Sequence, residues 1–193
     1  MKKILICIGA SGTGKNYISD KLISDYDFKP LVSHTTRPIR PNETNHVDYH
    51  FISEDDFLQM NRDDEFIEYR IYNTLVNNIP AIWYYGLSKQ KLYDENYVVI
   101  LDVQGAKDFI EYYGVENCIV AHIKCDPNIT RQRSIDRGGH DEIEFQRRLG
   151  DDLRVFSYSE LEGLVDLTID NDGRFTIEEI CEFILDNINS SVL

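Results

Sequence analysis

Short hydrophobic runs alternate with segments of helical periodicity over most of the chain. The runs at 4–8, 97–101 and 118–123 are almost continuously apolar, which is typical of parallel strands buried on both faces. After the first run, apolar residues recur at helical spacing and predict an amphipathic helix over 14–26. This alternation predicts an α/β domain of three layers, in which helices cover both faces of a central parallel sheet.

The second half of the chain continues the pattern, and its helices have recognisable starts. Asp126 precedes a proline at the first helical position, and Thr176 forms a capping box with Glu179. We expect, in order, a helix over 105–113, a helix from Pro127 that ends at Gly138 and Gly139, a helix from Asp141 toward Leu161, a strand over 164–169 and a closing helix from Thr176.

Residues 34–88 lack this regularity and predict an inserted, largely β subdomain. Pro38 and Pro41 exclude a helix in its first part. Ser53 is a typical helix N-cap, with Asp56 as the expected capping-box partner. We also expect a short strand at 31–33, extended segments at 48–53 and 65–70, and an aromatic closing segment at 83–86.

Composition limits the classes of function. The chain has 193 residues with 34 acidic and 20 basic side chains, a formal net charge of −14. Such a charge disfavours double-stranded nucleic acid and anionic membranes as partners. The N-terminal apolar run is too short for a secretory signal or a membrane span. We therefore expect a single cytoplasmic domain whose four cysteines, Cys7, Cys118, Cys125 and Cys181, are reduced.

The strongest motif follows the first apolar run directly. It matches the P-loop pattern G-x-x-x-x-G-K-[ST], except that Asn16 replaces the final Ser or Thr. Such a loop points backbone N–H groups at phosphate, and Lys15 would reach the terminal phosphates of a nucleotide. Because the usual hydroxyl ligates Mg²⁺, the Asn16 amide oxygen either replaces it or metal binding is lost. The loop consists of Gly9, Ala10, Ser11, Gly12, Thr13, Gly14 and Lys15.

Two basic clusters and one acid complete the candidate chemistry. The first cluster surrounds Gly138 and predicts either an arginine lid over polyphosphate or a helix face neutralised by acidic neighbours. The second lies in the inserted subdomain and predicts a separate anion site. Asp102 follows a central strand, where it either holds a metal through water or caps the next helix. The clusters are Arg131, Arg133, Arg137, Arg147 and Arg148, and Arg37, Arg40, Tyr49 and Tyr85.

Taken together, these motifs resemble the guanylate kinase family from Ile4 to about Asp172. The resemblance rests on the P-loop, on residues 33–40 with Glu43, on 48–53, 65–68, 84–86 and 102–105, and on Arg133 through Arg137 to Arg148-Leu149. It implies a P-loop NTPase fold with a core of 1–33, 89–125 and 150–193, a nucleoside monophosphate-binding insertion at 34–88 and a lid at 126–149.

The resemblance also implies an activity and roles for single residues. The protein would transfer the γ-phosphate of Mg-ATP to a nucleoside monophosphate, GMP or dGMP first, acting as a monomer or homodimer. Lys15, Arg37, Arg133, Arg137 and Arg148 would be catalytic, and Asn16 and Asp102 would be near Mg²⁺. The P-loop, Asn16 and Asn171 would bind ATP, and the acceptor would contact Ser33, Arg37, Arg40, Glu43, Tyr49, Glu68 and Tyr85.

Several positions depart from the family pattern and leave alternatives open. Besides Asn16, Leu87 stands where a Ser or Thr usually contacts guanine, and Ile100 replaces a second acid before Asp102. An extra segment lies around Asn73 to Pro80. A kinase with another acceptor, such as a different nucleoside monophosphate or ribose 1,5-bisphosphate, and a non-catalytic binding module are the alternatives.

Overall fold

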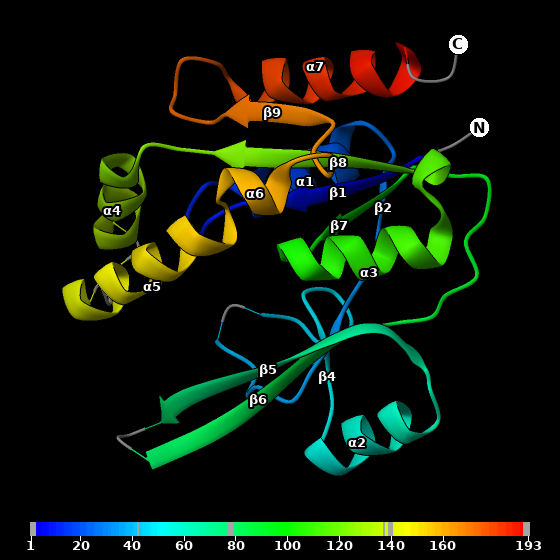
Figure 1. Ribbon diagram of the computed structural model, residues 1–193, viewed down its shortest axis with the longest axis vertical. Helices are drawn as coiled ribbons and strands as arrows, with labels where there is room; N and C mark the ends of the chain where they lie inside the picture. The colour runs from blue at the N-terminus through cyan, green and yellow to red at the C-terminus, as the bar shows by residue number, and fades with distance from the viewer. Residues whose placement is uncertain (1–2, 42, 77–78, 137, 139–140, 191–193) are drawn as a thin grey trace. The chain divides into compact units, whose positions relative to one another are not determined.

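The computed structural model describes residues 3–41, 43–76, 79–136, 138 and 141–190. The chain divides into two compact units (Figure 1). The first contains Met1–Pro30 and Asp94–Leu193, and the second contains Leu31–Tyr93. The inserted subdomain expected at 34–88 lies within the second unit.

The first unit is built on a five-stranded parallel sheet, as the apolar runs predict. The strand order is β2-β7-β1-β8-β9, and every pair of neighbours is parallel. All five residues of the central strand β1 are buried, because sheet neighbours and helices cover it on every side. The strands are β1 (Ile4–Ile8), β2 (Lys29–Pro30), β7 (Tyr97–Ile100), β8 (Cys118–Lys124) and β9 (Leu167–Asp170).

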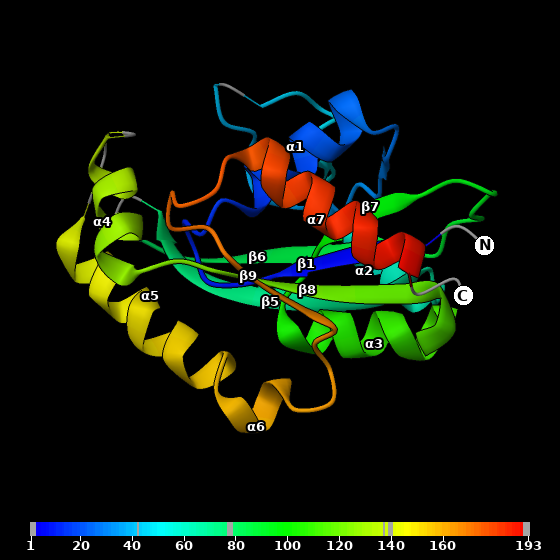
Figure 2. The same ribbon diagram turned by 90° about the horizontal axis from the view of Figure 1, so that it is seen from above.

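Helices cover both faces of this sheet. The α1 helix (Lys15–Asp25) and the α7 helix (Ile177–Ser190) lie on one face, and α3 (Val103–Tyr113) lies on the other (Figure 2). Side chains such as Leu22 and Ile184 form one core cluster with the strands. The capping box at Thr176 forms as expected, with Glu179 N–H donating to Thr176 Oγ1 at 3.2 Å and Thr176 N–H donating to Glu179 Oε2 at 2.8 Å. The predicted three-layer α/β architecture is therefore confirmed.

The helix expected from Asp141 toward Leu161 is broken. The α5 helix (Glu142–Val155) ends at Phe156, whose ring stacks on His122 of β8 at 5.2 Å between centroids. A separate short helix, α6 (Tyr158–Leu161), follows, and its last carbonyl accepts the N–H groups of the next turn. That turn occupies 162–164, and β9 begins only at Leu167, later than expected. Before α5 come η1 (Val115–Asn117) and α4 (Pro127–Asp136).

The second unit contains a four-stranded sheet in the order β4-β3-β6-β5 and one helix. The strand expected at 31–33 is displaced: residues 29–30 pair with β7 and residues 34–35 pair with β6, so 31–33 connect the two sheets. Ser53 caps α2 as expected, accepting Asp56 N–H at 3.1 Å. The elements are β3 (His34–Thr35), β4 (His50–Phe51), α2 (Glu54–Arg62), β5 (Phe66–Val76) and β6 (Ile79–Ser88).

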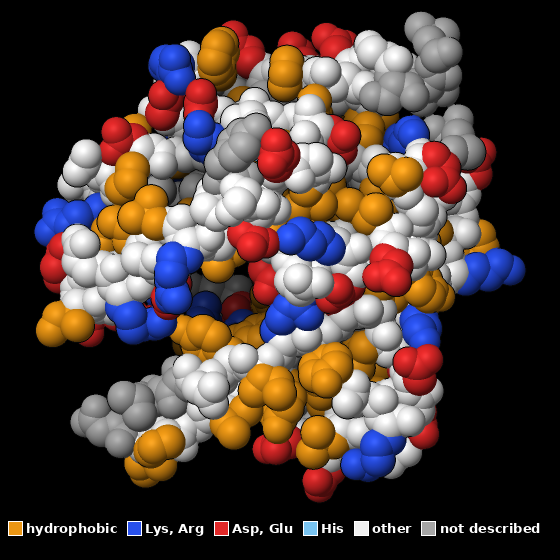
Figure 3. Space-filling view, in the orientation of Figure 1, with side chains coloured by type: hydrophobic (Ala, Val, Ile, Leu, Met, Phe, Trp, Pro, Cys, Tyr) orange, Lys and Arg blue, Asp and Glu red, His pale blue; other side chains and the backbone are white. Residues whose placement is uncertain are grey.

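The β5–β6 hairpin contains the segment around Asn73 to Pro80. The two strands stay paired out to Val76 and Ile79, so this segment lengthens both strands. Near α2, Phe57 stacks on Phe66 at 4.4 Å between ring centroids and forms the core of the unit. Farther out, Ile79 and Ile82 are exposed, and Figure 3 shows hydrophobic side chains on the surface over the hairpin.

Two further expectations concern the whole chain. All four cysteines are free thiols, as expected. None of the helices in the described part of the chain is long and apolar enough to cross a membrane.

Candidate active site

The loop between β1 and α1 has a backbone that requires glycine at two of its positions. Gly9 has a φ of 150°, and a Cβ there would lie 2.2 Å from the carbonyl oxygen of Ile123. Gly14 has a φ of 92°, and a Cβ would lie 2.3 Å from Nδ2 of Asn171. Both glycines therefore let the loop approach its neighbours, the β8 backbone at Ile123 and the Asn171 side chain, more closely than any other residue allows.

Lys15 folds back over this loop. Its Nζ donates to the carbonyl oxygens of Gly9 at 2.7 Å and Ala10 at 2.8 Å. Burial lowers the pKa of Lys15, and the negative charge of Asp152 acts in the opposite direction. The ammonium group is thus held at the loop by neutral carbonyl groups, which an anionic ligand can replace.

Asn171 supports the loop from the end of β9. Its side chain is buried, and Nδ2 donates to the carbonyl oxygen of Thr13 at 2.8 Å. Arg133 of α4 donates through Nη2 to the Asn171 carbonyl oxygen at 3.1 Å and through Nη1 to the Gly12 carbonyl oxygen at 3.5 Å. The structure therefore brings two expected site residues, Arg133 and Asn171, to the backbone of the P-loop.

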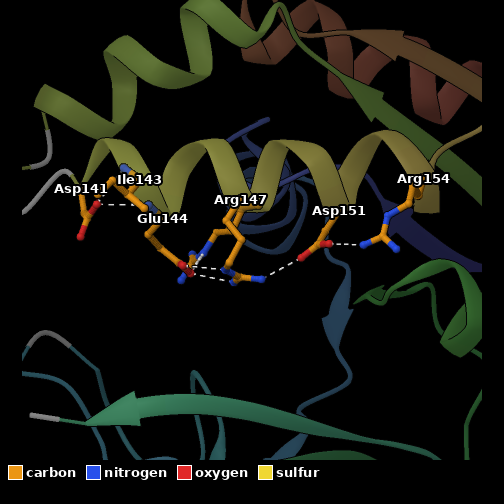
Figure 4. Close-up of polar contacts among 7 residues, drawn as sticks. Asp141, Ile143, Glu144, Arg147, Asp151 and Arg154 are labelled. Atoms are coloured by element: carbon orange, nitrogen blue, oxygen red, sulfur yellow. Dashed lines mark hydrogen bonds and ion pairs between the residues drawn. The ribbon is translucent and has the colours of Figure 1, made fainter. Parts of the chain in front are cut away.

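Three other arginines of the basic cluster, Arg131, Arg147 and Arg148, pair with acids of α5, and Figure 4 shows such pairs along this helix. Arg148 donates through Nε to Glu144 Oε1 at 2.7 Å, and Arg147 bonds to Glu144 and to Asp151. These arginines hold the pKa of Glu144 well below its usual range, at about 2. Acidic neighbours thus neutralise the arginines of this helix, as one of the two interpretations of the basic cluster expects, and the arginine lid stays a prediction. Arg137 lies outside the described residues.

A cavity connects the P-loop with α4 and α5. Arg148 and Asp152, one helical turn apart on α5, both line it. Asp152 also accepts a hydrogen bond from the Ser11 N–H at 3.1 Å. No pattern in the sequence singles out Asp152, because an acid on a polar helix is normally a solvated residue. The other lining residues are Ala10, Ser11, Gly12, Cys125, Pro127, Thr130, Ser134, Asp141, Glu144, Phe145 and Leu149.

Asn16 and Asp102 are the residues expected near magnesium. Asn16 is exposed at the start of α1. Asp102 is the N-cap of α3, and its Oδ1 accepts the Gly105 N–H at 2.6 Å. Within the described ranges no three His, Cys, Asp or Glu side chains form a metal cluster. Mg²⁺ bound with a nucleotide needs few protein ligands, since phosphates and waters supply the rest, so the oxygen atoms of these two side chains fit that role.

The second unit holds a buried arginine at the centre of its anion-binding candidates. Arg37 is 4% exposed, and its Nη1 and Nη2 donate to the two carboxylate oxygens of Glu43 at 2.9 and 2.7 Å. The hydrogen bonds from Arg37 lower the pKa of Glu43. Arg40 is exposed, while its backbone N–H donates to Glu43 Oε2 at 2.8 Å. Glu43 therefore orders the loop that carries both arginines.

Aromatic and acidic side chains surround this loop. The guanidinium of Arg37 lies 5.5 Å from the ring centroid of Tyr49, which is 6.0 Å from that of Tyr85. Tyr85 pairs with Arg70 across the hairpin, and Arg70 Nη1 lies 3.7 Å from Oε2 of the buried Glu68. Arg70 is a neighbour of the site that the sequence did not single out.

Three other positions bear on the expected acceptor site. Ser33 is half-buried, and its carbonyl oxygen accepts the His50 N–H at 2.9 Å. Leu87 is 0% exposed, so its side chain is part of the packing of the second unit. Ile100 is partly buried against the main core. The two departures from the family pattern, Leu87 and Ile100, are therefore apolar packing residues.

Comparison with known proteins identifies the family. The family model described as guanylate kinase matches residues 1–190. The chain belongs to the guanylate kinase family. A guanylate kinase of Porphyromonas gingivalis is 29% identical over 189 residues, covering 93% of this chain and 94% of that protein. A guanylate kinase of Helicobacter hepaticus is 33% identical over 151 residues, covering 74% and 72%.

Solved structures agree on the fold. The crystal structure of guanylate kinase from Anaplasma phagocytophilum has a TM-score of 0.69 with 23% identity and covers 98% of this chain and 85% of that one. This likeness shows the P-loop NTPase fold of the family. The resemblance stated from the sequence motifs is confirmed, and family membership makes an ATP-dependent nucleotide kinase the class of enzyme to test.

Proposed function

We propose that this protein is a nucleoside monophosphate kinase that transfers the γ-phosphate of ATP to GMP or dGMP. The observation that carries the proposal is the geometry of the P-loop. Glycine at positions 9 and 14 allows its tight backbone, and the Lys15 ammonium donates hydrogen bonds to its carbonyl oxygens. A family member that serves only as a binding module has no need for this ammonium group. The preserved loop therefore supports catalysis.

The first unit would bind ATP. The backbone N–H groups from Gly9 to Asn16 and the positive end of α1 favour polyphosphate. Lys15 would move from the loop carbonyls to the terminal phosphates, and Arg133, Arg137 and Arg148 would neutralise charge that develops during transfer. Asn171, which supports Thr13, would lie near the adenine.

The second unit would bind the acceptor. Arg40 is the exposed cation of its loop, and Arg37 and Glu43 hold that loop in place. Arg37, Arg40, Tyr49 and Tyr85 would contact the acceptor phosphate, with Ser33 and Glu43 beside it. The buried carboxylate of Glu68 would accept the ring N–H and amino group of guanine. Since Leu87 is buried, Glu68 is the main source of base selectivity in this proposal.

In the proposed reaction these side chains would position and stabilise the substrates rather than form covalent bonds with them. In-line phosphoryl transfer depends on alignment of donor and acceptor and on positive charge around the transferred group. Mg²⁺, bound with ATP near Asn16 and Asp102, would supply part of that charge. The arginines would first have to leave their acidic partners, such as Glu144 for Arg148. Binding of polyphosphate provides the competing anion.

The test is ADP release from Mg-ATP with GMP, dGMP, AMP, CMP, UMP, dTMP and ribose 1,5-bisphosphate as acceptors, with Lys15→Ala as the blank. We expect activity with GMP and dGMP and its loss in Lys15→Ala, while circular dichroism shows the fold unchanged. A different preferred acceptor would overturn the guanine assignment but keep the kinase. No release with any acceptor, together with no ATP binding by calorimetry, would favour the binding module.

A further inference from the structure

A carboxylate accepts a hydrogen bond from a backbone N–H group of the P-loop. Oδ2 of Asp152 accepts the Ser11 N–H at 3.1 Å, although the two residues are far apart in sequence. Ser11 lies within the loop whose N–H groups favour phosphate, and a carboxylate is an anion of similar hydrogen-bonding chemistry. Asp152 therefore accepts a hydrogen bond from an N–H group that a polyphosphate would use.

The surroundings of Asp152 act on its charge in opposite directions. Its side chain is half-buried, and burial raises the pKa of the carboxyl above its ordinary value. The Ser11 N–H, Lys15 and Arg148 act to lower that pKa, and the neighbouring Asp151 acts to raise it. Among the groups that raise the pKa of Lys15, the negative charge of Asp152 has the largest effect. The carboxylate thus interacts with the cation on which the proposed ATP site depends.

One face of α5 presents both charges to the same cavity. Arg148 and Asp152 are four residues apart and both line the cavity next to Ala10, Ser11 and Gly12. Arg148 is paired with Glu144 at 2.7 Å, and Asp152 is bonded to the loop. A polyphosphate that entered the cavity would break both contacts, because its negative charge attracts Arg148 away from Glu144 and repels Asp152 from the loop.

We propose that Asp152 competes with nucleotide phosphate for the P-loop and so sets the affinity of this protein for ATP. The inference rests on the proposed ATP site. The hydrogen bond from Ser11 to the carboxylate holds α5 against the loop. When ATP binds, the phosphates replace it at Ser11, α5 shifts, and Arg148 exchanges Glu144 for phosphate. Asp152 is accordingly a positioning residue that opposes binding.

The chain offers a matched control. Asp151, the preceding residue, has the same charge but pairs with Arg147 at 2.7 Å and with Arg154, both of which belong to α5 itself (Figure 4). Asp151→Asn and Asp152→Asn change the net charge equally. Only Asp152→Asn removes a negative charge from the P-loop, so the difference between the variants separates local competition from general charge repulsion.

The experiment measures dissociation constants of ATP and of inorganic tripolyphosphate by calorimetry for the wild type, both variants and Lys15→Ala. We expect Asp152→Asn to bind both ligands about tenfold more tightly in low salt, and Asp151→Asn to differ from the wild type by less than about twofold. Higher salt should reduce the difference in affinity between Asp152→Asn and the wild type. At 0.1 M ionic strength the Debye length is about 10 Å, so charge repulsion is screened. Tripolyphosphate lacks a base, so an equal gain shows that the phosphates are what Asp152 opposes.

A measurement on the wild type keeps the test valid if a variant folds poorly. The Ser11 amide resonance should shift in an NMR titration with tripolyphosphate, as its hydrogen-bond acceptor is exchanged. Unchanged or weaker binding by folded Asp152→Asn, or a Ser11 resonance that ignores the ligand, would overturn the inference alone. Wild type that binds neither ATP nor tripolyphosphate would overturn the proposed function as well.

Discussion

At the level of single residues, Asn171 shows how a buried side-chain amide supports the backbone of the P-loop. Its Nδ2 donates a hydrogen bond to the Thr13 carbonyl oxygen at 2.8 Å. A Cβ atom at position 14 would clash with this same Nδ2 atom. Because Asn171 is only 4% exposed, water cannot easily replace that hydrogen bond. Asn171 therefore contributes to the shape of the P-loop, whatever its contact with adenine.

Replacing Asn171 with Ala should cost about 1–3 kcal/mol of stability, because the Thr13 carbonyl is left without its donor. ATP binding should weaken as well, since the loop loses a support. Urea denaturation and calorimetry measure the two effects. Asn189→Ala is a control, because Asn189 is exposed on α7. Equal stability of the two variants would contradict the supporting role.

Asn16 is the residue at which the loop departs from the usual P-loop pattern. It is exposed at the start of α1, in the position where a hydroxyl usually ligates the magnesium of the nucleotide. Replacing Asn16 with Ser should lower the Mg²⁺ concentration needed for half-maximal ADP release, because Ser restores the usual ligand. Magnesium titrations at saturating ATP measure this. No shift in the midpoint would show that the amide oxygen serves equally well.

At the level of elements, the β5–β6 hairpin divides into a packed base and an exposed outer part. Leu87 near the base is 0% exposed, whereas Ile82 on the same strand is 49% exposed. The base packs beside the Phe57–Phe66 stack, and its strand pair carries Glu68 and Tyr85. Packing at the base therefore positions residues of the proposed acceptor site.

Truncating Leu87 to Ala should destabilise the protein by about 2–5 kcal/mol, as expected when a buried leucine leaves a cavity. The same truncation at Ile82 should cost less than about 1 kcal/mol, because its side chain is already exposed to water. Chemical denaturation of the two variants makes the comparison. Similar losses in both would show that the outer hairpin is packed. For the same reason, Leu87→Ser is a test of stability before it is a test of base selectivity.

At the level of the whole molecule, an acidic protein is proposed to bind two anionic substrates. The net charge of −14 opposes their approach, so binding depends on the few places where cations gather. In the first unit these are Lys15, Arg133 and Arg148, and in the second Arg37 and Arg40. Most of these cations are held by carbonyls or carboxylates within their own unit. Substrate binding would exchange these partners.

Binding of Mg-ATP should therefore stabilise the folded chain measurably. A ligand at one hundred times its dissociation constant adds about 2.7 kcal/mol. For a chain of this size the melting temperature should rise by about 5–10 °C. Thermal unfolding with and without Mg-ATP measures the shift, and Lys15→Ala at the same concentration should lose most of it. An equal shift in both proteins would place the nucleotide elsewhere.

The sequence by itself determined the features that depend on neighbours along the chain. Apolar runs predicted β1, β7 and β8, because a strand buried on both faces tolerates few polar side chains. Caps at Ser53 and Thr176 predicted where helices begin, because the first N–H groups of a helix need nearby acceptors. The P-loop was equally visible, since its glycines and lysine are contiguous.

The tertiary structure alone decided the features that depend on contacts between distant residues. The bond between Asp152 and Ser11, the support of Thr13 by Asn171 and the burial of Leu87 all depend on which strands and helices meet. The early end of the predicted helix at Phe156 depends likewise on its contact with His122. Residues that are close in sequence determine which face of a strand or helix is buried and where a helix is capped. The hydrogen-bond partner of a polar side chain from a distant part of the chain is determined only when the chain has folded.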